Sequence, residues 1–252
     1  MENQKVAIIT GATGGIGFAV AKRLGNDGFT IVLNGIEDDK GAERVAELQA
    51  AGIQAEYYGF DVTQEEAVTQ NITQIGEKYG KIDVLVNNAG GLGGRSRFED
   101  MTTEFYRFVM ALNLDSVFFA SRAAIPFLKK GDHPTIINYT SNAAWNAGGP
   151  GAGIYGTSKA GVHTITRALA KDLAEYGIRV NAVSPGTIDT PFHKQIKSTK
   201  PEVFASWAKN IMLGRLGQPE DVAGVISFLA SADAAFLTAE TIQVGGGQAL
   251  GI

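Results

Sequence analysis

The sequence predicts an α/β protein built on a doubly wound parallel sheet of about seven strands, with helices on both faces to give three layers. Two patterns lead to this prediction. Short apolar runs alternate with longer amphipathic segments along the whole chain, and most of these runs are continuously apolar, as expected of strands covered on both faces. Alternation of strand and helix is typical of right-handed βαβ units, whose strands pair in parallel.

The segments between the apolar runs have helical spacing. Ile16, Val20 and Leu24 follow the first run on one helical face, and the segment Asp221–Leu229 repeats the pattern, which indicates helices packed on a core. The predicted strands are Lys5–Thr10, Thr30–Asn34, Ala55–Asp61, Val84–Asn87, Thr135–Thr140, Arg179–Ser184 and Thr241–Val244.

The stretch Pro191–Gly217 departs from the strand–helix alternation, because it is helical in parts but lies between a strand and the next helix. Such a long insertion at a strand end is typical of a lid over a site. No Ser/Pro-rich linker or change in composition divides the chain. We therefore expect residues 1–252 to form a single domain with a lid insertion around 191–217.

The composition excludes several classes of protein. With 44% hydrophobic and 19% charged residues the chain is not disordered. The net charge of -4 gives no basic surplus for nucleic acid or an anionic membrane. The absence of cysteine excludes disulfides and thiolate metal ligands, and His133, His163 and His193 form no metal set with nearby carboxylates. No basic segment followed by a long apolar run opens the sequence, and no run reaches the ~18 apolar residues of a membrane span. These features predict a soluble, cytoplasmic protein without a metal.

The first strand ends in a glycine-rich turn, Thr10-Gly11-Ala12-Thr13-Gly14-Gly15-Ile16-Gly17, and a helix follows. Glycines at this place let backbone N–H groups approach a pyrophosphate, which then lies at the positive end of the helix dipole. A plain tight turn is the alternative reading of a glycine cluster. Its position after the first strand of an α/β chain favours a nucleotide.

Five blocks of sequence carry a resemblance to a known family. They are Thr10–Gly17 (T-G-x-x-x-G-x-G), Asn87–Gly90 (N-N-A-G), Tyr155–Lys159 (Y-x-x-x-K), Asn181–Gly186 (N-x-V-x-P-G) and Gly214–Asp221 (G-R-x-G-x-P-E-D). In order and spacing they resemble the short-chain dehydrogenase/reductase family over nearly the full chain. The resemblance implies an NAD(P)-dependent oxidoreductase that acts on CH–OH groups, on a Rossmann-type fold.

The resemblance also implies which residues hold the cofactor, and it assigns Asn87 to bracing the central strands instead. Val62 would contact the adenine through its backbone, and Thr190 would hydrogen-bond the nicotinamide amide or a phosphate. The implied contacts are Gly11, Thr13, Gly15, Ile16, Gly17, Asp61, Val62, Asn88, Ala89, Gly90, Tyr155, Lys159, Pro185, Gly186, Ile188 and Thr190.

The choice between NAD and NADP is normally made just after the second strand, where an acid receives the ribose 2′-OH and an arginine accepts a 2′-phosphate. Gly35 occupies the place where many NAD-specific relatives have Asp. However, no Arg or Lys lies between Asn34 and Asp39. A 2′-phosphate would meet Glu37, Asp38 and Asp39, and unpaired like charges disfavour that. The sequence therefore predicts NAD over NADP.

The catalytic residues form a constellation around Tyr155. It is followed four residues later by Lys159, and this spacing places both side chains on one face of a helix. We expect the ammonium group, together with the positive nicotinamide of the oxidised cofactor, to favour the phenolate and so to lower the tyrosine pKa. The resemblance assigns Ser141 to orienting the substrate oxygen, with Thr140 as the neighbouring alternative. It assigns Asn113 to a helix interruption that holds a water for proton relay.

The substrate is left open by these residues. We expect a small-molecule alcohol, sugar or hydroxy acid, with 3-oxoacyl-[acyl-carrier-protein] reductase as the second reading and a non-catalytic cofactor-binding protein as the third. In place of the basic residues of many carrier-protein reductases the chain has Gly131 and Tyr176, although Lys129 and Lys130 lie nearby. The resemblance also implies a homotetramer, with helices around Leu114–Lys130 and Ala152–Tyr176 as interfaces.

Overall fold

A computed structural model describes residues 4–248, which contain a seven-stranded, fully parallel sheet in the order β3-β2-β1-β4-β5-β6-β7. The strands are β1 (Lys5–Ile9), β2 (Phe29–Gly35), β3 (Ala55–Gly59), β4 (Val84–Asn87), β5 (Thr135–Tyr139), β6 (Arg179–Pro185) and β7 (Thr241–Val244). The predicted doubly wound sheet of about seven strands is confirmed.

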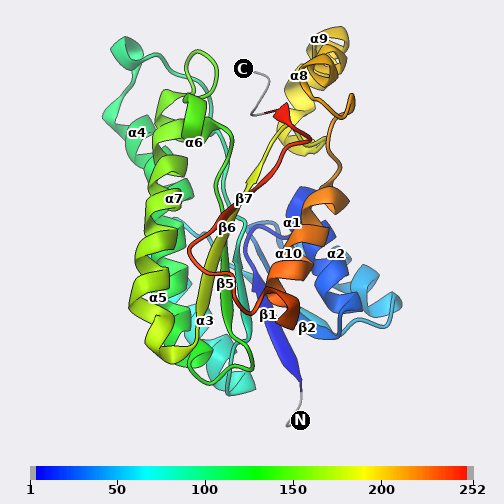
Figure 1. Cartoon of the computed structure of the whole chain (residues 1–252), viewed down its shortest axis with the longest axis vertical. Helices are drawn as coiled ribbons and strands as arrows, with labels where there is room; N and C mark the ends of the chain where they lie inside the picture. The colour runs from blue at the N-terminus through cyan, green and yellow to red at the C-terminus, as the bar shows by residue number, and fades with distance from the viewer. Residues whose placement is uncertain (1–3, 249–252) are drawn as a thin grey trace.

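Helices cover both faces of the sheet, which gives three layers (Figure 1). The helices are α1 (Gly15–Asn26), α2 (Asp38–Ala50), α3 (Glu65–Tyr79), α4 (Thr103–Met110), α5 (Ser116–Leu128), α6 (Ala143–Asn146), α7 (Gly153–Leu173), α8 (Lys194–Thr199), α9 (Pro201–Ser206) and α10 (Pro219–Ala230). In Figure 1, α1, α2 and α10 lie to one side of the strands and α3, α5 and α7 to the other.

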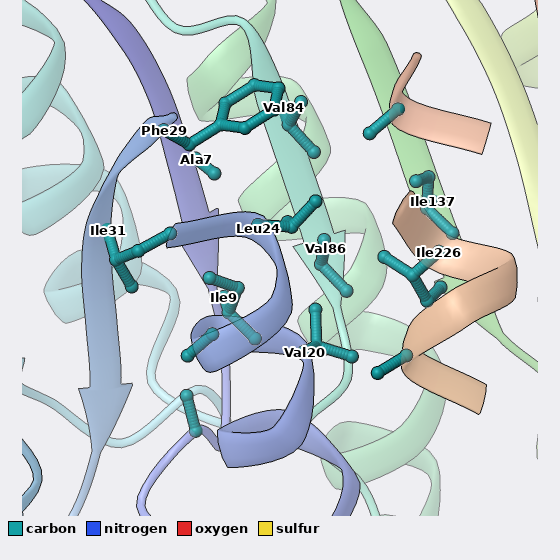
Figure 2. Close-up of a cluster of buried hydrophobic side chains, with 14 of the residues drawn as sticks. Ala7, Ile9, Val20, Leu24, Phe29, Ile31, Val84, Val86, Ile137 and Ile226 are labelled. Atoms are coloured by element: carbon teal, nitrogen blue, oxygen red, sulfur yellow. The ribbon is translucent and has the colours of Figure 1, made fainter. Parts of the chain in front are cut away.

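Two hydrophobic clusters, one on each face, hold the layers together. In β1, Ala7 and Ile9 belong to the cluster under α1 and α10, while Val6 and Ile8 belong to the one under α3, α5 and α7. Figure 2 shows Ile9 on the first face, beside Val20 and Leu24 of α1. Because successive strand residues point to opposite faces, a strand buried on both sides must be apolar at every position, which explains the continuous apolar runs.

The order of strands creates a topological switch point between β1 and β4. The chain builds β1, β2 and β3 outward in one direction, then returns to place β4 on the other side of β1. In such sheets the loops at the carboxyl ends of the two strands diverge, and ligands bind in the crevice between them. The glycine-rich turn follows β1 and the Asn87–Gly90 block begins at the end of β4, so both border this crevice.

One long helix runs from Thr103 to Leu128, because a π-turn at Ala111–Asp115 joins α4 to α5. Among residues 4–248 it is the one helix that could cross a membrane by length and composition. The sequence prediction, which counted uninterrupted apolar residues, did not find it. The helix packs beside α3 and α7, and Val117, Ala120, Ala124 and Leu128 are fully buried in the domain. Its place in a helix layer accounts for its apolar character.

The segment 191–217 stands at the carboxyl end of the sheet, where Figure 1 shows α8 and α9 beyond the strand tips. It contains two further short helical turns, Pro191–His193 and Trp207–Asn210. The His193 ring lies 4.9 Å from Phe192, 5.5 Å from Phe204 and 5.3 Å from Trp207, centroid to centroid. These rings give the segment a small aromatic core of its own above the crevice.

Candidate active site

The carboxyl ends of β1, β4, β5 and β6 open into a cleft of about 700 Å³. Its walls come from the glycine-rich turn, the loop after β4, the start of α7, the loop after β6 and the beginning of the 191–217 segment. A concave site of this size at a topological switch point is the usual place for a dinucleotide and a small substrate in an open α/β sheet.

The glycine-rich turn is braced so that its backbone faces the cleft. Asn88 donates its amide to the carbonyls of Thr10 and Gly11, 2.9 Å from each. A Cβ on Gly17 would lie 2.5 Å from the Asn88 nitrogen and 2.6 Å from the Gly11 oxygen, so a side chain at position 17 would break this brace. Gly14, which caps α1, offers no side-chain acceptor, and the first N–H groups of α1 are left for an anion. These features fit the pyrophosphate of a dinucleotide cofactor.

Tyr155 and Lys159 lie on the first turns of α7 and both line the cleft. The Lys159 ammonium nitrogen is 6.0 Å from the centroid of the Tyr155 ring. It donates a hydrogen bond of 3.0 Å to the carbonyl of Tyr139 at the end of β5. A Cβ on Gly90 would lie 3.0 Å from this nitrogen, so the glycine leaves room for the lysine. The helix and two strand ends thus converge on one buried cation.

Burial changes the proton affinity of both side chains. The pKa of Lys159 is lowered to about 8 because its ammonium group is removed from water. The pKa of Tyr155 is raised by burial, and a hydrogen bond with Ser141 acts in the opposite direction. In the protein alone, the net effect on the Tyr155 pKa is therefore upward. The expected lowering also needs the positive charge of an oxidised nicotinamide, so it stays a prediction for the cofactor complex.

Ser141 and Thr140 have different surroundings, although they are neighbours at the end of β5. The hydroxyl of Thr140 is buried and donates to the carbonyl of Val183 on β6 at 3.1 Å. Ser141 lines the cleft and reaches Tyr155. The two hydroxyls therefore divide into one that ties strands together and one that faces the reaction space, in agreement with the choice of Ser141.

Asn113 lies in the π-turn and is completely buried. Its amide donates to the carbonyls of Gly91 and Val109 at 2.8 and 3.0 Å, and its oxygen accepts from the Gly91 N–H at 2.9 Å. The side chain thus fixes the loop after β4. Because both amide hydrogens are used, a water held here for proton relay would have to donate to an oxygen, either the Asn113 amide oxygen through its second lone pair or a backbone carbonyl of the π-turn.

Most of the implied cofactor residues line the cleft. They are Gly11, Thr13, Gly15, Ile16, Gly17, Asn88, Gly90, Tyr155, Lys159, Pro185, Gly186, Ile188 and Thr190. The lining does not include Asp61, Val62 or Ala89. The Asp61 carboxylate accepts the N–H and hydroxyl of Thr63 at 2.8 Å, and Val62 is packed in the core under α3.

Several cleft residues were not predicted as site residues. Glu37 and Lys40 line the cleft beyond β2 and form an ion pair of 2.8 Å. Lys40 directly follows the stretch Asn34–Asp39, in which the sequence has no Arg or Lys. Its i,i+3 spacing from Glu37 is the signal that could have linked the two residues. At the other end, the lining includes Asn142, Asn146, Thr187, Phe192, His193 and Gln248.

Other noted residues have structural partners. Asn87 braces the central strands, as expected, by donating to Ser121 and Asn138. His163 contacts the Thr241 hydroxyl at 2.9 Å and the edge of Trp145. Arg95 donates to the carbonyl of Pro150 at 2.9 Å. Within residues 4–248, no group of three His, Asp or Glu side chains is placed to hold a metal ion.

Comparisons with known proteins agree with this geometry. A family model described as enoyl-(acyl carrier protein) reductase matches residues 11–249. A diacetyl reductase [(S)-acetoin forming] of Staphylococcus aureus is 37% identical, covering 98% of each chain. The chain is a short-chain dehydrogenase/reductase. A 3-oxoacyl-[acyl-carrier-protein] reductase of Thermotoga maritima is 36% identical, covering 96% of this short-chain dehydrogenase/reductase and 97% of the relative. The structure of an actinorhodin polyketide ketoreductase with NADPH superposes with a TM-score of 0.92 at 31% identity, covering 99% and 98% of the two chains.

As a member of the short-chain dehydrogenase/reductase family, the protein is an NAD(P)-dependent oxidoreductase that interconverts a secondary alcohol and a ketone. The family resemblance seen in the sequence blocks is confirmed over the whole matched range.

Proposed function

We propose that this short-chain dehydrogenase/reductase uses NAD(H) to interconvert a small-molecule alcohol and ketone, with Tyr155, Lys159, Ser141 and Asn113 as its catalytic residues. The observation that carries the proposal is the convergence of three groups at one end of the cleft. Tyr155 and Ser141 line the cleft close enough for the serine hydroxyl to lower the tyrosine pKa, and the Lys159 ammonium lies buried 6.0 Å from the Tyr155 ring. The braced glycine turn lines the same cleft.

The geometry divides the chemistry among these residues. A bound nicotinamide supplies a hydride to the carbonyl carbon, or accepts one from the alcohol. In reduction, the Ser141 hydroxyl orients the substrate oxygen, and the Tyr155 phenol gives its proton to the oxygen as negative charge develops there. The Lys159 ammonium stabilises the phenolate that remains. Asn113 keeps the loop after β4 in place, and we assign to its π-turn the carbonyl that holds a relay water.

The preference for NAD rests on Glu37. Its carboxylate lines the cleft just beyond β2, where an acid can accept the ribose 2′-OH. Lys40 neutralises this carboxylate through both of its oxygens, so a 2′-phosphate would have to break the pair before gaining a cation. Ile36, which precedes Glu37, is exposed and offers no donor. Thr190 and Ile188, which line the opposite part of the cleft, are assigned to the nicotinamide half.

The experiment is a comparison of kcat/KM for NADH and NADPH with a panel of ketones, for the wild type and Glu37→Gln. We expect NADH to be preferred, and the substitution to reduce the preference about tenfold by removing one charge-assisted hydrogen bond. Glu43→Gln, at an exposed position of α2, the helix that Glu37 precedes, serves as the matched control and should leave the cofactor preference unchanged. A wild-type preference for NADPH would contradict the assignment.

The second candidate is reduction of a 3-oxoacyl group on a carrier protein, which the relative from Thermotoga maritima favours. The surface offers little for an acidic carrier, because the Lys129 ammonium lies 3.4 Å from the centroid of the Tyr176 ring and the chain has a net charge of -4. We therefore rank it second. Including an acetoacetyl thioester beside diacetyl and acetoin in the ketone panel decides between the two.

The location and assembly belong to the same proposal. We place the protein in the cytoplasm, which cell fractionation tests, and we propose a homotetramer in which residues 191–217 act as a lid on each single-domain subunit. A tetramer with dihedral symmetry needs at least two different interfaces. The exposed aromatic side chains include Tyr106, Phe108 and Phe118 on the long helix and Phe228 and Phe236 at α10 and just beyond it.

A further inference from the structure

Gln248, at the end of the segment Gly245–Gln248, forms part of the cleft wall. Gly245 lies against the loop after β6, while Gly246 and Gly247 lie against residues 211–213. Gly186 donates its N–H to the carbonyl of Val244 at 3.0 Å, and a Cβ on Gly186 would lie 2.8 Å from the Gly245 Cα and 2.7 Å from the Gln248 side-chain oxygen. This close approach carries Gln248, 93 positions after Tyr155 in the sequence, into the same cleft.

Gln248 is fixed by Thr187. Its side-chain oxygen accepts the Thr187 N–H at 2.8 Å and lies 3.2 Å from the Thr187 hydroxyl. Its Nε2 is 3.0 Å from the same hydroxyl. One of the two Nε2 hydrogens can satisfy that contact, so within residues 4–248 the other has no protein acceptor. A fixed carboxamide with a spare donor therefore lines the substrate end of the cleft.

Asn142 lies beside it and directly follows Ser141. Its Nδ2 approaches the Gln248 oxygen at 3.5 Å, at the outer limit of a hydrogen bond. Its Oδ1 is buried and has no partner among the described residues. The terminal torsion of an asparagine is soft, so a small rotation turns this oxygen toward the cleft. An unpaired carbonyl in a low-dielectric site gains from any donor that a ligand brings.

The charges at this end of the cleft exclude an ionic substrate group. Apart from its two tyrosines, the cleft is lined by four titratable side chains, namely Glu37, Lys40, Lys159 and His193. Glu37 and Lys40 pair with each other beyond β2, and Lys159 is bound to the Tyr139 carbonyl. Burial and Lys197 lower the pKa of His193, against the opposing effect of Asp189, which keeps the ring neutral near pH 7. A substrate carboxylate here would have no free cation to pair with.

We propose that the carboxamides of Asn142 and Gln248 form a subsite for a second, uncharged oxygen of the substrate, so that hydroxyketones, diketones and diols are preferred over simple ketones and keto acids. The inference rests on the proposed function, since Ser141 and Tyr155 must hold the reacting oxygen beside this subsite. A carboxamide offers both a donor and an acceptor, which allows it to bind a hydroxyl or a carbonyl. A site built to hydrogen-bond a substrate oxygen rejects the analogue that lacks it, because its polar groups stay unpaired.

The test compares three four-carbon ketones with the full-length protein and NADH: butanone, its hydroxyl derivative acetoin, and the anion α-ketobutyrate. We expect kcat/KM for acetoin to exceed that for each of the other two by about tenfold or more. Asn142→Ala should lower the value for acetoin about tenfold and leave that for butanone within about threefold. Gln248→Met should lower the ratio of acetoin to butanone in the same direction. Asn71→Ala, an asparagine of α3 outside the cleft, is the control and should change neither.

A binding measurement separates recognition from turnover. In a Tyr155→Phe background, NADH fluorescence reports the dissociation constants of acetoin and butanone, and adding Asn142→Ala should weaken acetoin alone. Equal losses for both ketones would overturn the proposal, as would a wild type that prefers butanone or α-ketobutyrate. If the wild type reduces no ketone with NADH or NADPH, the proposed function itself fails. Turnover of butanone without selectivity for acetoin would contradict the subsite proposal and leave the proposed function intact.

Discussion

Lys159 is the residue at which stability and chemistry conflict. Its side chain is almost completely buried, and its ammonium group has one hydrogen bond, to the Tyr139 carbonyl. The lowered pKa of about 8 means that the folded protein binds this proton less tightly than the unfolded chain does. Near neutral pH the protein therefore holds a charge that burial disfavours, beside the phenol whose proton it is proposed to control.

This conflict predicts a pH-dependent stability for Lys159→Met. When the folded pKa of a lysine lies below its unfolded pKa, the charged side chain lowers the free energy of unfolding. The loss is complete at pH values below the folded pKa and disappears as the pH rises to the unfolded pKa. The free energy of unfolding of the variant, relative to that of the wild type, should be about 2–3 kcal/mol higher at pH 7 than at pH 10. Urea unfolding at the two pH values measures this, and Lys171→Met, at an exposed position of α7, is the control. Equal differences at both pH values would show that the charge carries no such cost.

At the same scale, the sequence predicted candidate reacting groups but not their surroundings. Tyr155 and Lys159 were predicted because helical spacing and a family motif coincide there, and Ser141 because the resemblance assigns it. Gln248 was missed because it contacts Thr187 from 61 positions away, a proximity that only the folded chain creates. The resemblance implies adenine contacts for Asp61 and for the Val62 backbone; in the structure the Asp61 carboxylate bonds to Thr63 and the Val62 side chain packs in the core, so these contacts stay a prediction.

At the scale of elements, the strand positions could be predicted from the continuous apolar runs in the sequence. β4 and β7 have the predicted limits, and the other five predicted strands differ by one or two residues at their ends, since an apolar run marks burial rather than the last ladder hydrogen bond. In the long helix from Thr103 to Leu128, the interruption that the resemblance implies at Asn113 is present as a π-turn. The bond from the Asn113 side chain to Gly91 in another loop could not be predicted, because no local pattern encodes that contact.

We expect the 191–217 segment to close over the cleft when ligands bind, which can be measured. Trp207 packs against His193 and Phe204 in this segment, while the chain's other tryptophan, Trp145, lies on α6. In Trp145→Phe, acrylamide quenching therefore reports on Trp207 alone. We expect NAD⁺ with an alcohol substrate to lower the quenching constant about twofold or more, because closure over the cleft shields the indole. Trp207→Phe, which leaves only Trp145, is the companion variant, and a shielding confined to Trp145 would contradict a lid.

At the scale of the whole molecule, the open question is what covers the exposed aromatic side chains. Phe236 is fully exposed, and Phe108 and Phe118 are each more than 40% exposed. Aromatic side chains of this size gain free energy when they are removed from water. The long helix that carries Phe118 also carries Asn113, so an interface there would fix an element that supports the cleft.

The assembly prediction is a particle of four chains of 26.6 kDa each. Light scattering after size exclusion should give this mass for the wild type. Phe118→Asp should give smaller particles with lower kcat, because a charge cannot be buried unpaired in an apolar interface. Glu66→Gln, at an exposed position of α3 outside the two interface helices, should keep the wild-type mass. A monomeric wild type with full activity would rule out the tetramer.

The central claim is that Tyr155 transfers the proton while the cleft binds the nicotinamide cofactor, and one comparison tests it most directly. Ketone-dependent NADH oxidation and NADH binding are measured for the wild type, Tyr155→Phe and the control Tyr106→Phe on α4. Loss of the general acid should lower kcat/KM of Tyr155→Phe by roughly a thousandfold, with NADH affinity within about threefold of the wild type and Tyr106→Phe unchanged. A Tyr155→Phe variant that keeps its activity would contradict the account.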